Sequence, residues 1–313
     1  MNPADAAQTD AADINSYNEL HRPRVDDKYK QRMETAYTQD YLRIVGIEHY
    51  RLAYFTPDLA PDDLPAALER YLEVLLDPLE IKPDHVVLDV GCGIGATTAW
   101  MVRRYGCRVY AIDIVADFVD AAARRFAGDG MAERATAQKM DALDLAFPAA
   151  TFDFIVGLEV IYHFPDKQRF FTEAARVLKP GGTLVLSEYL TVPGAPRLGT
   201  QFVQMILESD KLETEATYRS YLAAANLSAP RLTDVFEQTV VGTNRAFRSS
   251  RYRSRVKAYS AVYFGLLFAA AMPAVYWLWE QLFKRGHARH VFMYSQKAAT
   301  PAPPPGLSSG AAG

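Results

Sequence analysis

Short apolar runs alternate with amphipathic stretches through the middle of this 313-residue chain. Five of the runs predict strands, at residues 85–90, 107–114, 135–140, 151–160 and 183–190. Apolar residues three and four positions apart predict helices between them, which end at Gly106, near Gly128 and at the Lys-Pro-Gly-Gly sequence of residues 179–182. Strands that alternate with helices in this order predict an α/β fold, in which helices cover both faces of a mostly parallel sheet.

Further elements are predicted on either side of this core. Residues 41–55 and 61–79 have helical spacing and predict a helical cap. After the fifth strand the pattern predicts two helices, at 201–210 and 217–227, and two more strands, at 231–241 and 288–298, which makes seven in all. The expected order is a cap (29–80), a core (81–241), an insert (242–287) and a last strand (288–298).

The composition narrows the class of protein. Half of the residues are hydrophobic and the net charge is −3, which favours a globular protein and argues against binding to nucleic acid. Cys92 and Cys107 make neither a disulfide framework nor a metal site, and a cytoplasmic location fits them best. Residues 1–28 lack the regions of a secretion signal, and with the Pro-, Gly- and Ala-rich residues 299–313 they are expected to be disordered.

A glycine loop follows the first predicted strand in the sequence VVLDVGCGIGATT. Asp89 ends the strand, and Gly91, Gly93 and Gly95 alternate before a helix begins. Glycine is needed where a backbone approaches a ligand closely or takes positive φ. The simplest interpretation is a tight strand-to-helix turn. The dinucleotide fingerprint G-x-G-x-x-G would need its third glycine one residue later, and a phosphate loop would need a Lys-Ser/Thr ending that is missing here.

This loop resembles the first motif of the class I S-adenosylmethionine (SAM) methyltransferases, which is an apolar strand, an acidic residue and G-x-G-x-G. The resemblance extends over residues 80–240 and implies a Rossmann-like sheet with SAM as the cofactor. It places Asp113, in AIDI, on the ribose hydroxyls and Asp141, in KMDALDLAF, on the adenine amino group. Asp89 would lie near the ammonium end of the methionine portion, cap the loop amides, or do both. The implied SAM-binding residues are Asp89, Gly91, Cys92, Gly93, Gly95, Asp113, Ile114, Asp141 and Ala142.

Two segments resemble the subgroup that contains tocopherol, sterol, glycine/sarcosine and natural-product methyltransferases. One is GIEHYRLAYF (46–55), which is similar to the subgroup's W-G-E-x-x-H-x-G-x-[FY] element over the SAM site, with Ala53 in place of glycine and Val45 in place of tryptophan. Tyr50 and Tyr54 there either contact substrate or pack within a helix.

The other segment, LEVIYHFPDK (158–167), resembles the subgroup's E-S-x-x-H-x-P-D-K. In related O-methyltransferases this histidine deprotonates the acceptor hydroxyl, which implies His163 as general base with Glu188 assisting it. The alternative is a histidine bonded to loop backbone. Glu159 either faces SAM or stabilises a carbocation, as in relatives that methylate alkenes, and the 18 tyrosines would suit a cation. O- and C-methylation both remain open.

An uncharged apolar segment, AYSAVYFGLLFAAAMPAVYWLW (258–279), lies in the insert. As a helix it would extend about 33 Å, near the thickness of a bilayer core. Crossing would separate the last two strands, so we expect a helical lid broken near Pro273 or a segment that enters one leaflet. Ordinary core packing is the third option. Six basic residues precede the segment and suit anionic head groups, a substrate diphosphate or a solvated helix face: Arg245, Arg248, Arg251, Arg253, Arg255 and Lys257.

The sequence therefore predicts a SAM-dependent methyltransferase without a metal ion, acting on an apolar small molecule such as a polyketide, terpenoid, sterol-like or quinone precursor. Its insert, at 245–285, would contact a membrane surface or cover the substrate. The alternatives are an N-methyltransferase of a small polar amine, a non-catalytic SAM-binding protein and an integral membrane protein.

Overall fold

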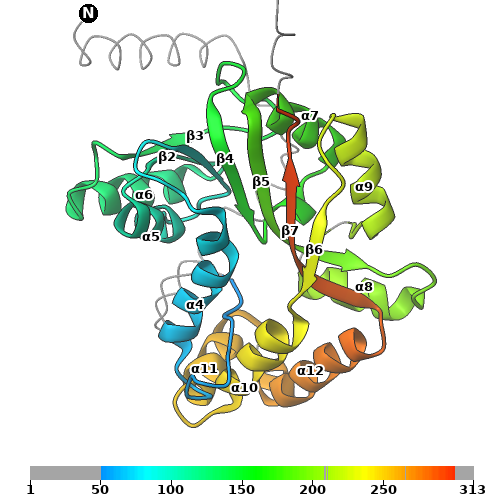
Figure 1. Cartoon of the computed structure of the whole chain (residues 1–313). Helices are drawn as coiled ribbons and strands as arrows, with labels where there is room; N and C mark the ends of the chain where they lie inside the picture. The colour runs from blue at the N-terminus through cyan, green and yellow to red at the C-terminus, as the bar shows by residue number, and fades with distance from the viewer. Residues whose placement is uncertain (1–50, 208, 210, 265, 300–313) are drawn as a thin grey trace, which may run out of the picture.

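The computed structural model describes residues 51–207, 209, 211–264 and 266–299 (Figure 1). Its sheet has the strand order β3-β2-β1-β4-β5-β7-β6, in which β1 to β5 are parallel and β7 is antiparallel to both of its neighbours. The strands are β1 (Val86–Val90), β2 (Arg108–Asp113), β3 (Ala135–Lys139), β4 (Phe152–Leu158), β5 (Leu178–Thr191), β6 (Arg231–Asp234) and β7 (Ala288–Gln296). This confirms the predicted seven-stranded, mostly parallel α/β fold.

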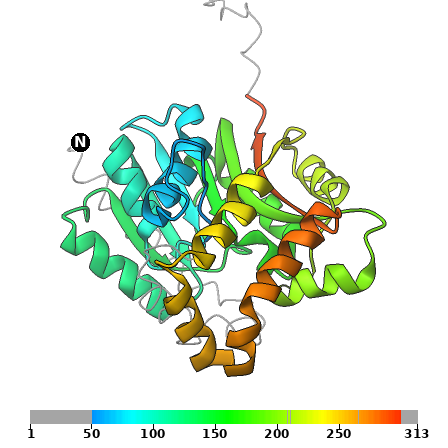
Figure 2. The ribbon, with the colours of Figure 1, turned by 90° about the horizontal axis from the view of Figure 1, so that it is seen from below.

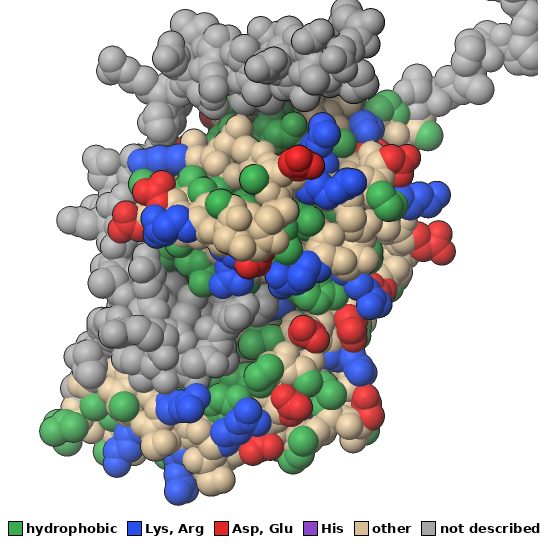
Figure 3. Space-filling model, turned by 90° about the vertical axis from the view of Figure 1, so that its left-hand side faces the viewer, with side chains coloured by type: hydrophobic (Ala, Val, Ile, Leu, Met, Phe, Trp, Pro, Cys, Tyr) green, Lys and Arg blue, Asp and Glu red, His purple; other side chains and the backbone are tan. Residues whose placement is uncertain are grey.

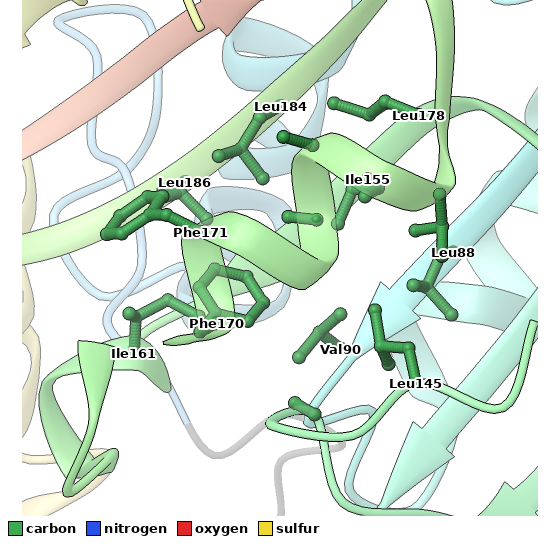
Figure 4. Close-up of a cluster of buried hydrophobic side chains, with 14 of the residues drawn as sticks. Leu88, Val90, Leu145, Ile155, Ile161, Phe170, Phe171, Leu178, Leu184 and Leu186 are labelled. Atoms are coloured by element: carbon green, nitrogen blue, oxygen red, sulfur yellow. The ribbon is translucent and has the colours of Figure 1, made fainter. Parts of the chain in front are cut away.

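Helices cover both faces of the sheet. The α-helices of the described residues are α4 (Leu64–Leu76), α5 (Ala96–Tyr105), α6 (Ala116–Gly128), α7 (Lys167–Val177), α8 (Arg197–Ile206), α9 (Glu215–Ala224), α10 (Gly242–Arg248), α11 (Arg253–Phe264) and α12 (Leu266–Lys284). The last three form the insert and lie below the sheet in Figure 1. Successive residues of β1 point to opposite faces: Val87 packs with α4, α5 and α6, whereas Leu88 packs with α7 and α9. Figure 4 shows this second layer, where Phe170 and Phe171 of α7 lie among Ile155 and leucines of the sheet.

The strand order reverses between β1 and β4, because the chain winds outward from β1 to β3 and then returns to place β4 on the other side of β1. In open α/β sheets, ligands bind beside the carboxyl ends of the strands at such a point. The glycine loop after β1 and the segment that carries Glu159 and His163 after β4 both lie at this edge.

The predicted sixth strand over 231–241 is wrong in its second half. β6 ends at Asp234, and Glu237–Val241 forms a π-helix that leads into α10. Asp234 Oδ1 accepts a hydrogen bond from Phe236 N at 3.1 Å, and the Thr239 hydroxyl donates to Val235 O at 2.6 Å. These local bonds favour a turn and a helix over continued strand pairing. The helical insert therefore begins near residue 237 rather than at 242.

The apolar segment of the insert is divided between two helices. α11 ends at Phe264 and α12 begins at Leu266, and Figure 2 shows the two forming a hairpin at the edge of the molecule. The predicted break near Pro273 is wrong, because Pro273 lies within α12, whose Met272 and Tyr276 pack against a cluster of buried residues from α4 and α10. Within the described residues, no helix combines the length and the apolar character needed to cross a bilayer.

The helix predicted from residue 166 to the Lys-Pro-Gly-Gly stop at 179–182 is confirmed as α7, which ends at Val177 because Leu178 already pairs with Phe152 of β4. One other prediction needs correction. The helix predicted over 41–55 lies outside the described residues up to 50, and the remainder is not helical. Its backbone bonds elsewhere instead: Tyr54 N donates to Ala67 O and Phe55 N to Gln238 O, both at 2.9 Å. Residues 1–28, Val45 and 300–313 also lie outside the described residues.

Candidate active site

The glycine loop turns across β2 as it leaves β1. The N–H groups of Gly91 and Cys92 both donate to Ile112 O, at 2.9 and 3.0 Å. Gly91 has φ +70°, and a Cβ there would lie 2.4 Å from Val160 Cγ2, so any side chain would be strained and overpacked. Gly93 (φ +53°) differs, because a Cβ there would meet no atom of the described residues within 4 Å. The loop therefore leaves open space above Gly93, where a ligand can approach the backbone closely.

Carboxylates follow three neighbouring strands at this edge of the sheet. Asp113 ends β2 and accepts hydrogen bonds from Gly93 N, at 2.9 Å, and from Val115 N, at 3.0 Å. Asp89, in β1, is 2% exposed and accepts from the Thr98 hydroxyl at 2.6 Å. Burial raises the pKa of Asp89 to about 6. Asp113 thus holds the Gly93 amide of the loop, while Asp89 ties β1 to the first turn of α5.

The other residues predicted to bind SAM lie around the same loop. Asp141 follows β3, and its Oδ1 accepts from Leu143 N at 2.9 Å, which fixes the carboxylate in a tight turn. Gly95 is the N-cap of α5 with φ +78°. Cys92 and Ala142 are buried, and Ile114 is half-buried beside Asp113. The structure brings these residues to the carboxyl ends of β1, β2 and β3, as the sequence predicted.

His163 ends a short 3-10 helix (Ile161–His163) that follows β4, and buried charges hold the backbone on both sides of it. Glu188 Oε1 accepts from Ile161 N at 3.0 Å, and its Oε2 accepts from the Tyr218 hydroxyl at 2.7 Å. Lys167 Nζ donates to Tyr162 O and Phe164 O, at 3.2 and 2.9 Å. Burial raises the pKa of Glu188. Glu188 therefore acts on the backbone that carries His163, a role that the sequence did not predict.

Glu159 occupies a strained position between β4 and this segment, with φ +53°. Its Oε1 accepts from Leu52 N at 3.1 Å, and its Oε2 accepts from the Tyr189 hydroxyl at 3.2 Å. The Tyr71 hydroxyl lies 3.4 Å from Oε1. Burial raises the pKa of Glu159 to about 7, so the carboxyl can hold or release a proton near neutral pH.

A buried chain of polar groups continues from Glu159 into the sheet, and sequence reasoning missed it. The Tyr71 hydroxyl donates to Ser187 Oγ, which lies 2.9 Å from His290 Nε2, and His290 Nδ1 lies 2.7 Å from Thr239 Oγ1. His290 is fully buried, and burial lowers its pKa to about 3. Tyr189 stacks on His290 with ring centroids 4.4 Å apart. These residues come from α4, β5, the π-helix and β7, so no local motif marks them.

Two tyrosines were predicted to contact substrate. Tyr50 lies outside the described residues. Tyr54 is half-buried in an extended segment, with its ring stacked on Phe292 of β7 at 5.9 Å between centroids. Tyr54 therefore packs against the sheet beside α4.

Arg51 provides a test of whether these residues suit SAM, which has both a cationic and an anionic end in its methionine portion. Its Nη2 donates to Leu68 O at 2.8 Å, but its buried Nε and Nη1 find no hydrogen-bond partner among the described residues. Such unsatisfied donors are rare in protein interiors and indicate a ligand. With the open space at Gly93 and the carboxylates of Asp89 and Asp113, the site fits SAM.

A glycine loop with acidic residues after three adjacent parallel strands defines the SAM-binding site of the class I methyltransferases. A family model described as a methyltransferase domain matches residues 88–186. Methyltransferase GfsG of Streptomyces halstedii is 30% identical over 218 residues, which cover 68% of this chain and 78% of that protein. This chain therefore belongs to the SAM-dependent small-molecule methyltransferases, and SAM is its cofactor.

Two further methyltransferases are similar to this chain, one in sequence and one in fold. The 27-O-demethylrifamycin SV methyltransferase of Amycolatopsis mediterranei (strain S699) is 31% identical over 186 residues, covering 57% of this chain and 68% of that protein. The crystal structure of geranyl diphosphate C-methyltransferase from Streptomyces coelicolor A3(2), in complex with S-adenosyl-L-homocysteine, has a TM-score of 0.68 at 19% identity, covering 89% of this chain and 100% of that one. At this identity the second match concerns the fold alone.

Proposed function

We propose that this methyltransferase transfers the methyl group of SAM to a hydroxyl group of an apolar small molecule. One observation carries the apolar character of the acceptor: aromatic side chains of the insert pack against Tyr189, a hydrogen-bond partner of Glu159, and share a cluster with Tyr162, the residue before His163. Trp279 and Phe283 of α12 contact the ring of Tyr189, which bonds to Glu159, and Tyr162 next to His163 belongs to the same cluster. The 27-O-demethylrifamycin relative supports oxygen as the acceptor atom.

In this mechanism the protein holds the acceptor oxygen in line with the donor methyl group, which supplies a carbon bound to a positively charged sulfur. With SAM bound, His163 would accept the proton of the hydroxyl while the oxygen takes the methyl group from the sulfonium sulfur, so that the C–O bond forms as the C–S bond breaks and the sulfur becomes a neutral thioether. Holding the partners in reactive geometry can supply roughly 7–11 kcal/mol of the barrier. Glu188 and Lys167 contribute indirectly, because they fix the backbone around His163.

The first experiment uses methyl-tritiated SAM, the purified full-length protein and a whole-cell extract of its source, followed by partition of the label between organic solvent and water. Label in the organic phase is the expected result, and its product goes to mass spectrometry. Label that stays in water overturns the apolar acceptor and favours an amine or another polar acceptor. SAM binding without transfer in any fraction overturns the catalytic proposal in favour of a non-catalytic SAM-binding protein.

His163 is tested once a product is known. We expect His163→Ala to lower kcat by roughly 10²- to 10⁴-fold, while the affinity for S-adenosylhomocysteine stays unchanged. A bell-shaped or sigmoidal pH profile of kcat that persists in His163→Ala would contradict its role as base. In that case Glu159, whose pKa is about 7, is the next candidate for the base.

We also propose that the hairpin of α11 and α12 contacts a membrane surface. Leu266 and Leu267, where the two helices meet, are 77% and 90% exposed, and Arg253 and Lys257 are exposed on α11. Figure 3 places Lys and Arg side chains at this lower end of the molecule, with acidic groups among them. Part of the basic run serves the fold instead: Arg248 pairs with Glu280 at 2.5 Å, and Arg245 lies over the ring of Phe55.

Co-sedimentation with vesicles tests this contact. Exposed leucines and basic residues are expected to bind vesicles that contain phosphatidylglycerol more strongly than pure phosphatidylcholine vesicles, at about 1 kcal/mol per engaged basic residue. The double change Leu266→Asp and Leu267→Asp should abolish binding without altering the melting temperature. The matched double change Leu198→Asp and Met205→Asp alters exposed apolar residues of α8 instead and should leave binding intact. Equal binding by the hairpin variant and the unmodified protein would refute the proposal.

A further inference from the structure

Arg51 stands apart from the other arginines of the described chain in having buried donors that find no acceptor among the described residues. Its Nη2 bonds to Leu68 O at 2.8 Å, and its Cζ lies 4.8 Å from the centre of the Tyr71 ring. Its Nε and Nη1 are shielded from solvent and reach no acceptor in the described part of the chain. A guanidinium presents its donors as a rigid fork that matches a carboxylate, so this pair of free nitrogens is suited to an anion with two oxygens.

The surroundings of Arg51 locate this anion at one end of the cofactor site. The next residue, Leu52, donates its N–H to Glu159 Oε1, which holds the chain against the carboxyl end of β4. The charges of Glu159 and Asp89 both act on Arg51 and favour its charged form, although burial outweighs them and lowers its pKa to about 10. Arg51 therefore stays a cation at neutral pH, within range of the carboxylate at the end of β1.

The two acidic groups do not neutralise Arg51 by direct contact, because their oxygens serve other donors. Asp89 Oδ2 accepts from Thr98, and Glu159 accepts from Leu52 and Tyr189. Arg51 forms no ion pair with any described residue, unlike Arg70, which pairs with Asp58 and Glu73. The site thus holds a carboxylate for a cation and, next to it, an unpaired guanidinium for an anion. A zwitterionic amino acid group is complementary to this site, because its ammonium suits the carboxylate and its carboxylate suits the guanidinium.

We propose that Nε and Nη1 of Arg51 bind the α-carboxylate of the methionine portion of SAM, and of S-adenosylhomocysteine after transfer. Arg51 is then the residue that recognises the anionic end of the cofactor, complementary to Asp89 at the ammonium group. The inference rests on the cofactor and not on the acceptor, so it stands or falls independently of the apolar hydroxyl substrate and of His163. It requires only a binding measurement, with no turnover.

The test compares two ligands that differ in one group. S-adenosylhomocysteine carries the α-carboxylate, and S-adenosyl-3-thiopropylamine lacks it but keeps the amino group. Isothermal titration calorimetry measures both with the full-length protein and with Arg51→Ala. Because the variant removes a charge-assisted bidentate hydrogen bond from a buried site, it should bind S-adenosylhomocysteine roughly 10- to 100-fold more weakly, which is about 1.4–2.8 kcal/mol. The affinity for the decarboxylated ligand should change by less than about twofold in the same variant.

Two controls separate recognition from folding. Arg103→Ala removes the same charge from an exposed position of α5, where Arg103 pairs with Asp129, and both ligands should bind it as they bind the unmodified protein. Arg51→Lys keeps the cation but not the fork, and its affinity should fall roughly 3- to 10-fold for S-adenosylhomocysteine alone. It also serves as the test variant if the alanine form does not fold.

The possible results are distinct. A weaker affinity confined to the ligand with the carboxylate supports the proposal. Equal weakening for both ligands would show that Arg51 supports the fold of the site without touching the carboxylate, and unchanged affinity for both would show that the free nitrogens face some other group. Either of these outcomes overturns the proposal. A further requirement is that the unmodified protein binds S-adenosyl-3-thiopropylamine at least roughly tenfold more weakly than S-adenosylhomocysteine.

Discussion

Replacing Asp89 by asparagine should stabilise the SAM-free protein while weakening its affinity for the cofactor. Asp89 is 2% exposed, and its carboxylate accepts a hydrogen bond from the Thr98 hydroxyl. Burial and the neighbouring charge of Asp113 raise its pKa to about 6, against the effects of Thr98 and Arg51. An asparagine side chain has nearly the same shape, can still accept the Thr98 bond through its carbonyl oxygen and carries no charge to desolvate.

The sign and size of the effect follow from the pKa values in the folded and unfolded chains. The folded carboxyl, with a pKa of about 6, holds its proton more tightly than the unfolded one at 3.8. Stability from this group is therefore fully present below pH 3.8 and is lost as the pH rises through 6. The loss amounts to about 3 kcal/mol at pH 7.5 and about half of that at pH 5. Asp89→Asn avoids this loss, so its advantage grows over that interval.

Guanidinium chloride unfolding of both proteins without SAM, at pH 5 and at pH 7.5, measures the effect. Asp120→Asn, the same change at an exposed position of α6, should alter the free energy of unfolding by less than about 0.5 kcal/mol at either pH. An Asp89→Asn protein that is less stable at pH 7.5, or whose advantage is the same at both pH values, would refute the reasoning. Calorimetry with S-adenosylhomocysteine should show the cost, a weaker affinity at pH 7.5.

Three other predictions concern the site and its supports. Gly91→Ala should destabilise the protein by about 3 kcal/mol, through backbone strain and overpacking against Val160. Gly93→Ala should cost only about 1 kcal/mol, through backbone strain alone. Similar melting temperatures of the two variants would contradict this. Lys167→Met should cost about 2–4 kcal/mol in urea unfolding, because two buried carbonyls beside His163 lose their donor, and a neutral result would show that this ammonium is dispensable. His290, with a pKa of about 3 against 6.5 when unfolded, should stay neutral, and its NMR signals should not titrate between pH 8 and 5. Protonation of the unfolded chain then lowers stability below pH 6.5, by about 2 kcal/mol at pH 5, and a His290 signal that titrates above pH 5 would rule out this environment.

Much of the cofactor site could be predicted because it is encoded locally. The alternating glycines, Asp89 and Asp113 occupy fixed positions relative to strand ends, and strand ends follow from the apolar pattern. In a parallel sheet all of these ends meet at one edge, so the prediction of their proximity needs no knowledge of side-chain packing.

The acceptor side of the site could not be predicted in the same way. Glu188 was expected to assist His163, but its bonds to Ile161 N and Tyr218 depend on how α7 and α9 pack against β5. The strand expected at 237–241 has the right apolar residues, yet one Asp234 side chain and the Thr239 hydroxyl turn it into a helix. The sequence placed Arg51 within the segment 46–55 that resembles an element over the SAM site, but its unused donors become visible only once the packing around it is known.

The helical insert leaves and rejoins the sheet at neighbouring points. Val235 N, just before the insert, donates a hydrogen bond to His290 O, just after it, at 2.9 Å. The two ends of the roughly fifty residues between them are therefore held next to each other. Because the pairing of β6 with β7 already holds the two ends of the insert together, replacing the insert by a segment of another length changes the loop-closure entropy of folding only slightly. The insert can therefore be exchanged as a unit. A chimera that carries the insert of another methyltransferase should keep the SAM affinity of this protein and acquire the acceptor preference of the methyltransferase from which the insert was taken.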